Sequence, residues 1–486
     1  MNAVSSDDTP DRAQARGVVE ELTSKVRGDV LTPGAPEYEH RRPIWNGMFD
    51  DATPTAIVRC VDARDCAAAL AVVSQLDMPL AVRGGGHHVA GFGTCHGGIV
   101  LDLGAMRSVT VDEHRGLARV DGGCTLYDVD SATSAVGCAV PLGVVSETGV
   151  GGLALSGGIG WRSRSHGFTS DNLLSARVVT AAGEIVTASE TENADLLWGL
   201  RGGGGNFGVV TEFTFATHDV DVLTVAEAYH GCRSAEDIEV LLRFFDAWGT
   251  GLPNDVNLWL AIEPYSAYYH SRLPAEAASG LVASFLACSS APSDGAVQAL
   301  APLLSEGTPL ASELSAMRLV DLQQVQDDSG SARRGMQTYM KSEAVTRLTA
   351  SMISGVADHM IRVPNDSSLF ELGLLGGALA EREDMHSAAG MRNAQHLAGF
   401  IMMAESKDRL DEHIAWARSG WGTLQEGTAS GGGYLNFDSA SDDDQRVVAS
   451  MSSASLSEKW AKLRELKRRW DPENLFRLNH NVTPAD

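Results

Sequence analysis

Three short glycine-rich runs limit most strongly what this chain can fold into. They lie at Gly84–Gly86, Gly149–Gly160 and Gly202–Gly208. The chain has 51 glycines in 486 residues, somewhat above the usual share of roughly 7%, and the excess gathers in these runs. Glycine adopts backbone conformations closed to other residues and allows another molecule to approach closely. The runs therefore mark loops that need backbone freedom, close approach, or both.

The third run contains the spacing Gly203-x-Gly205-x-x-Gly208, which nominally matches a dinucleotide-binding fingerprint. That fingerprint needs a helix directly after it, because the cofactor pyrophosphate lies at the helix N-terminus. Here Val209–Phe215 alternates in polarity as a strand does, so we exclude a Rossmann fold. Glycine loops without a helix still hold phosphates through backbone N–H groups. We therefore expect either a large phosphorylated cofactor held by several loops or ordinary tight turns.

Composition and charge exclude several classes of protein. Apolar residues make up 44% of the chain, as in an ordinary globular protein, and its length predicts two or three domains. The formal charge of −25 disfavours nucleic acid and anionic membranes as partners. No run approaches the roughly 20 apolar residues of a membrane span. The opening residues lack the apolar core of a signal peptide, so we expect a cytoplasmic protein.

The cysteines and histidines give no strong metal signature. Seven cysteines are scattered without a CxxC pair, which argues against a disulfide framework and a structural zinc site. His87 and His88 directly follow the first glycine run. Together with His96 and Cys95 they are a metal-site alternative, but no further carboxylate or thiolate stands at a convincing spacing. We predict no metal and favour a hydrogen-bonded loop role for His88.

The pattern of elements predicts an α+β protein. Strands are expected at residues 55–60 and 78–83, the second opening into the first glycine run, and a hairpin at 173–189. Longer helical patterns alternate with strand-like pieces from about 216 to 430. An amphipathic helix over 457–470 then ends before a proline. Both parts of the chain fit α+β domains.

Several motifs, in order along the chain, resemble one family. The first is Pro54-x10-Asp65, followed by Leu70, Leu80 and the closing Gly84-Gly85-Gly86-His87, with Cys66 in place of the usual aliphatic residue. Further matching segments are GVVSETGVGGLALSGGIGW, residues 167–215, GGGYLNF and WDPENLFRLNHNVTP. Together they resemble the berberine bridge enzyme-like oxidases of the vanillyl-alcohol oxidase/PCMH flavoprotein superfamily, with the closest pattern in bacterial oxidases of specialised metabolism whose FAD carries a single histidyl link.

The resemblance implies a PCMH-type FAD-binding α+β domain with an inserted α+β substrate domain. Residues 1–44 form a lead-in, 45–215 the FAD-binding domain and 216–430 the substrate-binding domain. Residues 431–486 return to the FAD-binding domain. The match is strong over 45–215 and 430–486 and weak in the middle, where the residues that select a substrate lie.

The resemblance also implies that FAD is bound covalently. His87 stands where the family attaches the flavin 8α-methyl group, and a neutral imidazole is a competent nucleophile. Doubly linked members have a cysteine at the position of Val145, so a second, cysteinyl link is not expected. The other expected cofactor-binding residues are Arg83, Gly84, Gly85, Gly86, His88, Gly91, Val145, Ser146, Thr148, Gly151, Gly152, Gly158, Asn206, Gly208, Val209, Tyr434, Asn436, Asn479 and Asn481, with capping as the alternative for the last two.

Three residues are candidates for catalysis. Thr148 stands where the family places the small residue that governs oxygen approach to the flavin; packing of a turn is the alternative. Tyr434, in Y-L-N-F, is the leading candidate base, although its pKa near 10 would have to be lowered. Glu371 matches an acidic residue that some bacterial relatives use in the pocket, and a solvated strand position is equally open.

The function expected from this resemblance is an FAD-dependent oxidase that transfers electrons from an alcohol or amine on a small metabolite to O2, giving H2O2. One alternative is an oxygenating or cyclising enzyme for a polyketide-like substrate. A carbohydrate oxidase and a protein that keeps flavin only structurally are further alternatives. The substrate and the oligomeric state, a homodimer included, stay open.

Overall fold

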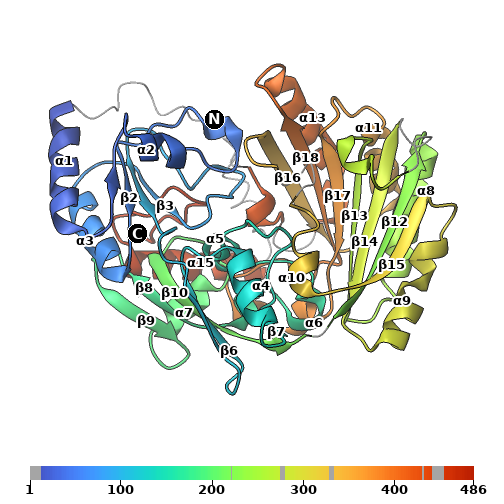
Figure 1. The fold of residues 1–486 in the computed structure, drawn as a ribbon, viewed down its shortest axis with the longest axis horizontal. Coiled ribbons are helices and arrows are strands. Elements are labelled where there is room, and N and C mark those ends of the chain that lie inside the picture. The colour runs from blue at the N-terminus through green and yellow to red at the C-terminus, as the bar shows by residue number, and fades with distance from the viewer. Residues whose placement is uncertain (1–11, 221, 274–279, 328–332, 429–431, 440–453) are drawn as a thin grey trace.

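The computed structural model describes residues 12–220, 222–273, 280–327, 333–428, 432–439 and 454–486. The first eleven residues and Gly431 of the GGGYLNF motif lie outside these ranges. Figure 1 shows an N-terminal half on the left and one large sheet on the right. In the part of the chain that is described, no helix is long and apolar enough to cross a membrane.

The N-terminal half contains two main sheets. In the first, with order β1-β2-β4-β3, the last three strands are parallel and β1 is antiparallel to β2. The second, β5-β6-β10-β8-β9, is antiparallel throughout, and β7 pairs with β11. The strands are β1 Val30–Leu31, β2 Ala56–Arg59, β3 Leu80–Arg83, β4 Ile99–Asp102, β5 Val109–Asp112, β6 Leu117–Asp121, β7 Cys138–Ala139, β8 Leu173–Val179, β9 Ile185–Ser189, β10 Val209–Ala216 and β11 His218–Asp219. Because β1 pairs with β2, the lead-in segment contributes to the first sheet.

One helix joins these two sheets into a common core. Helix α3 (Ala63–Val73) begins at Asp62, whose carboxylate accepts from the first free backbone N–H groups of the helix. Its buried Leu70 packs in the same cluster as Val179 of β8 and Val209 of β10. The other helices of this half are α1 Arg12–Lys25, α2 Pro36–Arg41, α4 Leu126–Ser134, α5 Val150–Leu155, α6 Ser163–His166 and α7 Ala194–Leu200.

The structure confirms the strand expected after the third glycine run. Strand β10 begins at Val209, directly after Gly208, and pairs with both β6 and β8. The predicted hairpin is also confirmed, with β8 and β9 joined by a turn in which Gly183 donates to Thr180. The glycine run therefore leads into a sheet and not into a helix, unlike the fingerprint of a Rossmann fold.

The second half is built on one antiparallel sheet of seven strands, in the order β15-β12-β14-β13-β17-β18-β16. Its strands are β12 Leu223–Cys232, β13 Val256–Pro264, β14 Leu281–Ser289, β15 Ala311–Met317, β16 Gln337–Val345, β17 Leu369–Leu374 and β18 His396–Ala404. Its helices are α8 Ala235–Gly249, α9 Ser293–Ser305, α10 Leu319–Leu322, α11 Ala350–Met360, α12 Ala378–Glu381 and α13 Leu410–Gly422.

The two faces of this sheet have different neighbours. One face packs against α8, α9, α11 and α13 and forms the largest apolar cluster described. Helix α8 shows why: a capping box of Ser234 and Asp237 starts it, and Ile238, Leu242 and Phe245 then recur on one side. Because side chains alternate along a strand, the odd-numbered residues of β13 and β17 face the other way, toward the N-terminal half.

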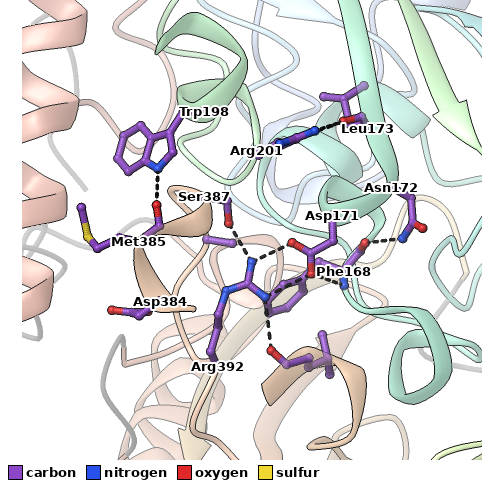
Figure 2. A network of polar contacts seen from close by, with 12 residues as sticks. Phe168, Asp171, Asn172, Leu173, Trp198, Arg201, Asp384, Met385, Ser387 and Arg392 are labelled. Carbon is purple, nitrogen blue, oxygen red and sulfur yellow. Dashed lines mark hydrogen bonds and ion pairs between the residues drawn. The ribbon is translucent and has the colours of Figure 1, made fainter. Parts of the chain in front are cut away.

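A buried ion pair joins the two halves. Figure 2 shows Arg392, from the second half, directed at Asp171 of the first. The guanidinium donates to the two carboxylate oxygens at 2.7 and 3.1 Å, and the two side chains are only 4% and 0% exposed. Arg392 also donates to Ser387 and to the Leu379 carbonyl. This network holds the segment that follows α12 against the N-terminal half.

The C-terminal helix α15 (Ala454–Trp470) returns to the first half. Its Lys459 pairs with Asp384 at 2.7 Å, close to the junction shown in Figure 2. Its buried Lys467 pairs with Asp471 and donates to the carbonyl oxygens of Asn206 and Phe476. The tail is therefore bonded directly to the third glycine run.

We predict that replacing Arg392 by Met lowers the free energy of unfolding by about 3–5 kcal/mol, because it leaves the Asp171 carboxylate buried without its counter-charge. Arg318→Met is the control, since its pair with Asp321 is similarly close but 65% and 45% exposed, and exposed pairs contribute about 0–1 kcal/mol. Urea unfolding followed by fluorescence measures both. Equal midpoint shifts in the two variants would contradict a special role for the buried pair.

Candidate active site

A large cavity lies between the glycine loops of the first half and the open face of the seven-stranded sheet. Its lining runs from the glycine loops, past Tyr434 and His480, to strands β13, β14 and β17 of the sheet. A cofactor held by the loops and a substrate held by the sheet would therefore meet in this one cavity.

The glycine runs line this cavity as the resemblance implies. The first two loops touch backbone to backbone, and a Cβ on Gly85 would stand 2.5 Å from the Gly149 nitrogen. By contrast, a Cβ on Gly152 or Gly205 would meet no protein atom within 4 Å, although both residues line the cavity. The packing of neighbouring side chains therefore does not require glycine at these two positions. They leave bare backbone facing a space that an elongated, phosphorylated cofactor fits.

His87 has the properties of an attachment residue. Its ring stacks on Trp45, with centroids 4.4 Å apart, and its Nε2 is buried without a hydrogen-bond partner. Burial lowers the pKa of His87 to about 4, so the imidazole is neutral at physiological pH. A neutral imidazole can act as a nucleophile, so His87, which lines the cavity, is the candidate attachment residue.

His88 is held by the protein instead. Its Nδ1 accepts from the Ala90 N–H at 3.0 Å, so the proton is on Nε2, which faces the Leu435 carbonyl at 3.2 Å. Burial lowers its pKa to about 3. His480 of the tail approaches the same carbonyl at 3.1 Å. The two rings thus position the Y-L-N-F segment, which is the hydrogen-bonded role favoured for His88.

The metal alternative receives no support from the geometry. His96 is exposed and hydrogen-bonds to Thr53, away from the partners of His88. Within the described ranges, no group of three or more His, Cys, Asp or Glu residues is arranged to hold a metal.

Most of the expected cofactor-binding residues line the cavity. They are Arg83, Gly84, Gly85, Gly86, His87, His88, Val145, Thr148, Gly151, Gly152, Gly208, Tyr434, Asn436 and Asn479. The Arg83 guanidinium, however, forms an ion pair with Asp102 at 2.8 Å and donates a hydrogen bond to the Arg41 carbonyl. Its charge stabilises the glycine loop rather than being free for an anionic ligand.

Six expected residues lie outside the cavity lining: Gly91, Ser146, Gly158, Asn206, Val209 and Asn481. Val209 points into the opposite core because side chains alternate along β10, and Val210 lines the cavity in its place. Ser146 is bound through its hydroxyl and its N–H to Asp327. Asn206 bonds the carbonyl of Gly203 and the backbone of the tail.

The remaining three differ in their surroundings. Gly91 approaches the ring of Phe49, and Gly158 approaches the side chain of Thr169, so each is explained by local packing. Asn481 keeps a buried side-chain oxygen without a partner and lies beyond the residues that form the wall.

The three candidate catalytic residues meet in this one cavity. Thr148, Tyr434 and Glu371 all line it, although they come from a glycine loop, the Y-L-N-F segment and strand β17. The Tyr434 hydroxyl oxygen accepts from the Ile159 N–H at 3.0 Å and from the Asn436 amide at 2.9 Å. Burial nevertheless raises the pKa of Tyr434 to about 12. The lowering that a tyrosinate base requires is therefore absent.

Glu371 has a different environment. Its carboxylate faces the cavity and, among the described residues, forms no hydrogen bond with the protein. Burial and the nearby charge of Glu263 raise its pKa to about 7. Carboxylates with such values serve as general acids and bases near neutral pH.

Two contributors were not expected from the sequence. Trp45, which stacks on His87, stands just at the start of the FAD-binding segment and has no motif to mark it. Glu263 lies in NLWLAIEPY, in the weakly matched middle of the chain. Alternation along that strand was the available signal, since Trp259, Ala261 and Glu263 share one face.

A glycine-walled cavity with an unpaired histidine, on a PCMH-type fold, defines an FAD-binding oxidoreductase. Residues 54–189 match the family described as "FAD binding domain", and residues 457–483 match "Berberine and berberine like". An FAD-linked oxidoreductase of Dictyostelium discoideum is 30% identical over 475 residues, which cover 97% of this chain and 98% of that protein. The chain belongs to the berberine bridge enzyme-like family of FAD-linked oxidoreductases.

Two further comparisons extend this result. (R)-6-hydroxynicotine oxidase of Paenarthrobacter nicotinovorans is 27% identical over 474 residues, covering 94% of this chain and 97% of that protein. The crystal structure of 6-hydroxy-D-nicotine oxidase from Arthrobacter nicotinovorans has a TM-score of 0.84 at 24% identity, covering 95% of this chain and 98% of that one. The fold expectation of a PCMH-type FAD-binding domain with a second α+β unit is confirmed.

Proposed function

We propose that the protein is an FAD-dependent oxidase whose flavin is linked through His87 alone, and that it oxidises an alcohol or amine on a small molecule with O2 as acceptor. The observation that carries this proposal is the convergence of His87, Thr148, Glu371 and Tyr434 on one cavity. Val145 lines the cavity where a cysteinyl link would start, and valine has no sulfur to form one. The whole-length relative named as an oxidase supports the same activity.

The protein groups have distinct roles in this proposal. Bound FAD supplies the two-electron acceptor. Glu371 takes the proton that leaves the substrate heteroatom, since its carboxylate faces the cavity without a protein donor. The Tyr434 oxygen already accepts two hydrogen bonds, so its O–H proton is left to orient a substrate or flavin atom. This exchanges the order of the two base candidates inferred from the sequence.

Oxygen reactivity tests the oxidase assignment. Thr148 lines the cavity, and its backbone is fixed by hydrogen bonds to Val145 and Leu126. Thr148→Leu should slow reoxidation of dithionite-reduced enzyme by O2 about tenfold, an increase of about 1.4 kcal/mol in the barrier, because the larger side chain occupies the approach of O2. Stopped-flow absorbance follows the flavin, and a peroxidase-coupled assay quantifies H2O2.

Thr148→Ser is the matched control, since it keeps the hydroxyl and should reoxidise at least as fast as the wild type. Equal rates in Thr148→Leu and the wild type would remove Thr148 from the oxygen path. Wild-type enzyme that reoxidises without releasing H2O2 would contradict the oxidase assignment.

A further inference from the structure

Two carboxylates share the substrate side of the cavity. Glu371 on β17 pairs in register with Ala261 on β13, and Glu263 lies two residues further along β13 on the same face. Diagonal neighbours of this kind have Cα atoms roughly 7–8 Å apart, a spacing at which one small group can contact both carboxylates. Tyr269 donates to Glu263 at 2.5 Å, which holds that side chain in place.

Among the described residues of the cavity wall, no arginine or lysine is free to balance these two groups. Arg83 is the one arginine or lysine among the described residues of the cavity wall, and it is paired with Asp102. His87 and His88 are neutral there because burial lowers their pKa values to about 4 and about 3. Burial also raises the pKa of Glu263, and burial together with the charge of Glu263 raises that of Glu371. Buried carboxylates are costly without a counter-charge.

Much of the rest of this wall is apolar or aromatic, although Ser284, Gln326 and Tyr268 also contribute to it. Trp161 is 4% exposed, yet its indole N–H has no hydrogen-bond partner, and the buried N–H of Trp259 has none either. Both tryptophans line the cavity beside Leu286 and pack in one cluster. Buried polar groups without partners are rare in folded proteins. The cavity therefore matches a ligand with an apolar or aromatic body and a positive charge.

We propose that the substrate is an amine on an apolar or aromatic skeleton, bound as its ammonium form between Glu263 and Glu371. This inference rests on the proposed oxidase function and selects the amine from its two substrate classes. Glu263 is the binding carboxylate, kept oriented by Tyr269, and Glu371 is the proton acceptor.

The reaction balances with groups already named. The Glu371 carboxylate removes one N–H proton from the ammonium and becomes a carboxylic acid, leaving a neutral amine. Bound FAD would accept the hydrogen and electron pair of the adjacent C–H bond as that bond breaks, and the nitrogen lone pair would form the C=N bond of an iminium. Water hydrolyses the iminium to a carbonyl compound and an amine. O2 takes two electrons and two protons, one of them from Glu371, to give H2O2.

Binding of two isosteric probes tests the inference in the flavin-loaded enzyme. Phenylethylamine carries an ammonium group where 2-phenylethanol carries a hydroxyl, and the two molecules are otherwise alike. The change in the flavin spectrum on binding, measured under anaerobic conditions, gives Kd for each. On the alkaline side of the Glu371 titration, at about 7, the amine should bind about 10- to 100-fold more tightly, the range expected for hydrogen bonds to a charged group. Glu263→Gln should remove about tenfold of this preference.

Glu313→Gln is the matched control, because Glu313 is an exposed glutamate on β15 of the same sheet; it should leave the preference unchanged. Wild-type enzyme that binds both probes equally, or neither, overturns the amine inference, as does a full preference in Glu263→Gln. These results differ from failure of the proposed oxidase function, in which reduced enzyme exposed to O2 yields no H2O2 whatever the probe affinities.

Discussion

His87→Ala is expected to lose all covalently held flavin, so that acid precipitation leaves a colourless polypeptide and a yellow supernatant. Wild-type protein should keep its flavin in the precipitate. The physical reason is that His87 lines the cavity with its Nε2 free of hydrogen bonds, and its lowered pKa of about 4 keeps the imidazole neutral and nucleophilic. The cavity itself persists in the variant, so FAD can still bind without the covalent bond.

His88→Ala is the matched control for this experiment. It removes the neighbouring imidazole, whose two nitrogens already contact Ala90 and Leu435, and it should keep flavin in the precipitate. Mass spectrometry of a flavin-bearing peptide that contains residues 87 and 88 locates the bond. Flavin released by acid from the wild type would contradict the covalent link, and flavin retained by His87→Ala would contradict the residue.

Glu371→Gln is expected to slow flavin reduction by substrate about 10²- to 10⁴-fold, the usual effect of losing a general base. The rate of flavin reduction in the wild type should also rise with pH through about 7. The raised pKa of Glu371 makes its carboxylate a proton acceptor only above that value. In Glu371→Gln this rising limb should disappear. Anaerobic stopped-flow bleaching of the flavin, across a pH series, measures both effects.

Tyr434→Phe separates the two candidate bases. Since burial raises the pKa of Tyr434 to about 12, the phenol stays protonated near neutral pH, and its loss should slow reduction less than Glu371→Gln while leaving the limb near pH 7 intact. Covalent flavin content should be unchanged in both variants. If Tyr434→Phe slowed flavin reduction more than Glu371→Gln did, and also shifted the pH at which the rate rises, Tyr434 would be the base.

Much of the first half of the molecule could be read from local patterns. The alternation of Val209–Phe215 predicts a strand after the third glycine run, and β10 is that strand. The hairpin of β8 and β9 and the strand that opens into Gly84 follow in the same way. These predictions succeed because a side-chain period of two and the conformational range of glycine act over a few residues.

Contacts between distant segments could not be predicted from the sequence. The pKa of Tyr434 is raised because the residue is 1% exposed. The Ile159 N–H that contacts its hydroxyl comes from 275 residues away. Glu263 and Glu371 are diagonal neighbours on one face of β13 and β17 only because of the register in which those strands pair.

The family could therefore be predicted from the chain itself, since its motifs are short local patterns. The proposed flavin attachment at His87 and the valine at position 145 come from the same local motifs. The composition of the substrate wall depends on strand register, on burial and on the packing of the two halves. These decide which side chains line the wall, which of them are charged and which carboxylate lacks a partner. Register is set by the helices that cover one face of the seven-stranded sheet, because a slip of one residue would turn every side chain to the wrong face.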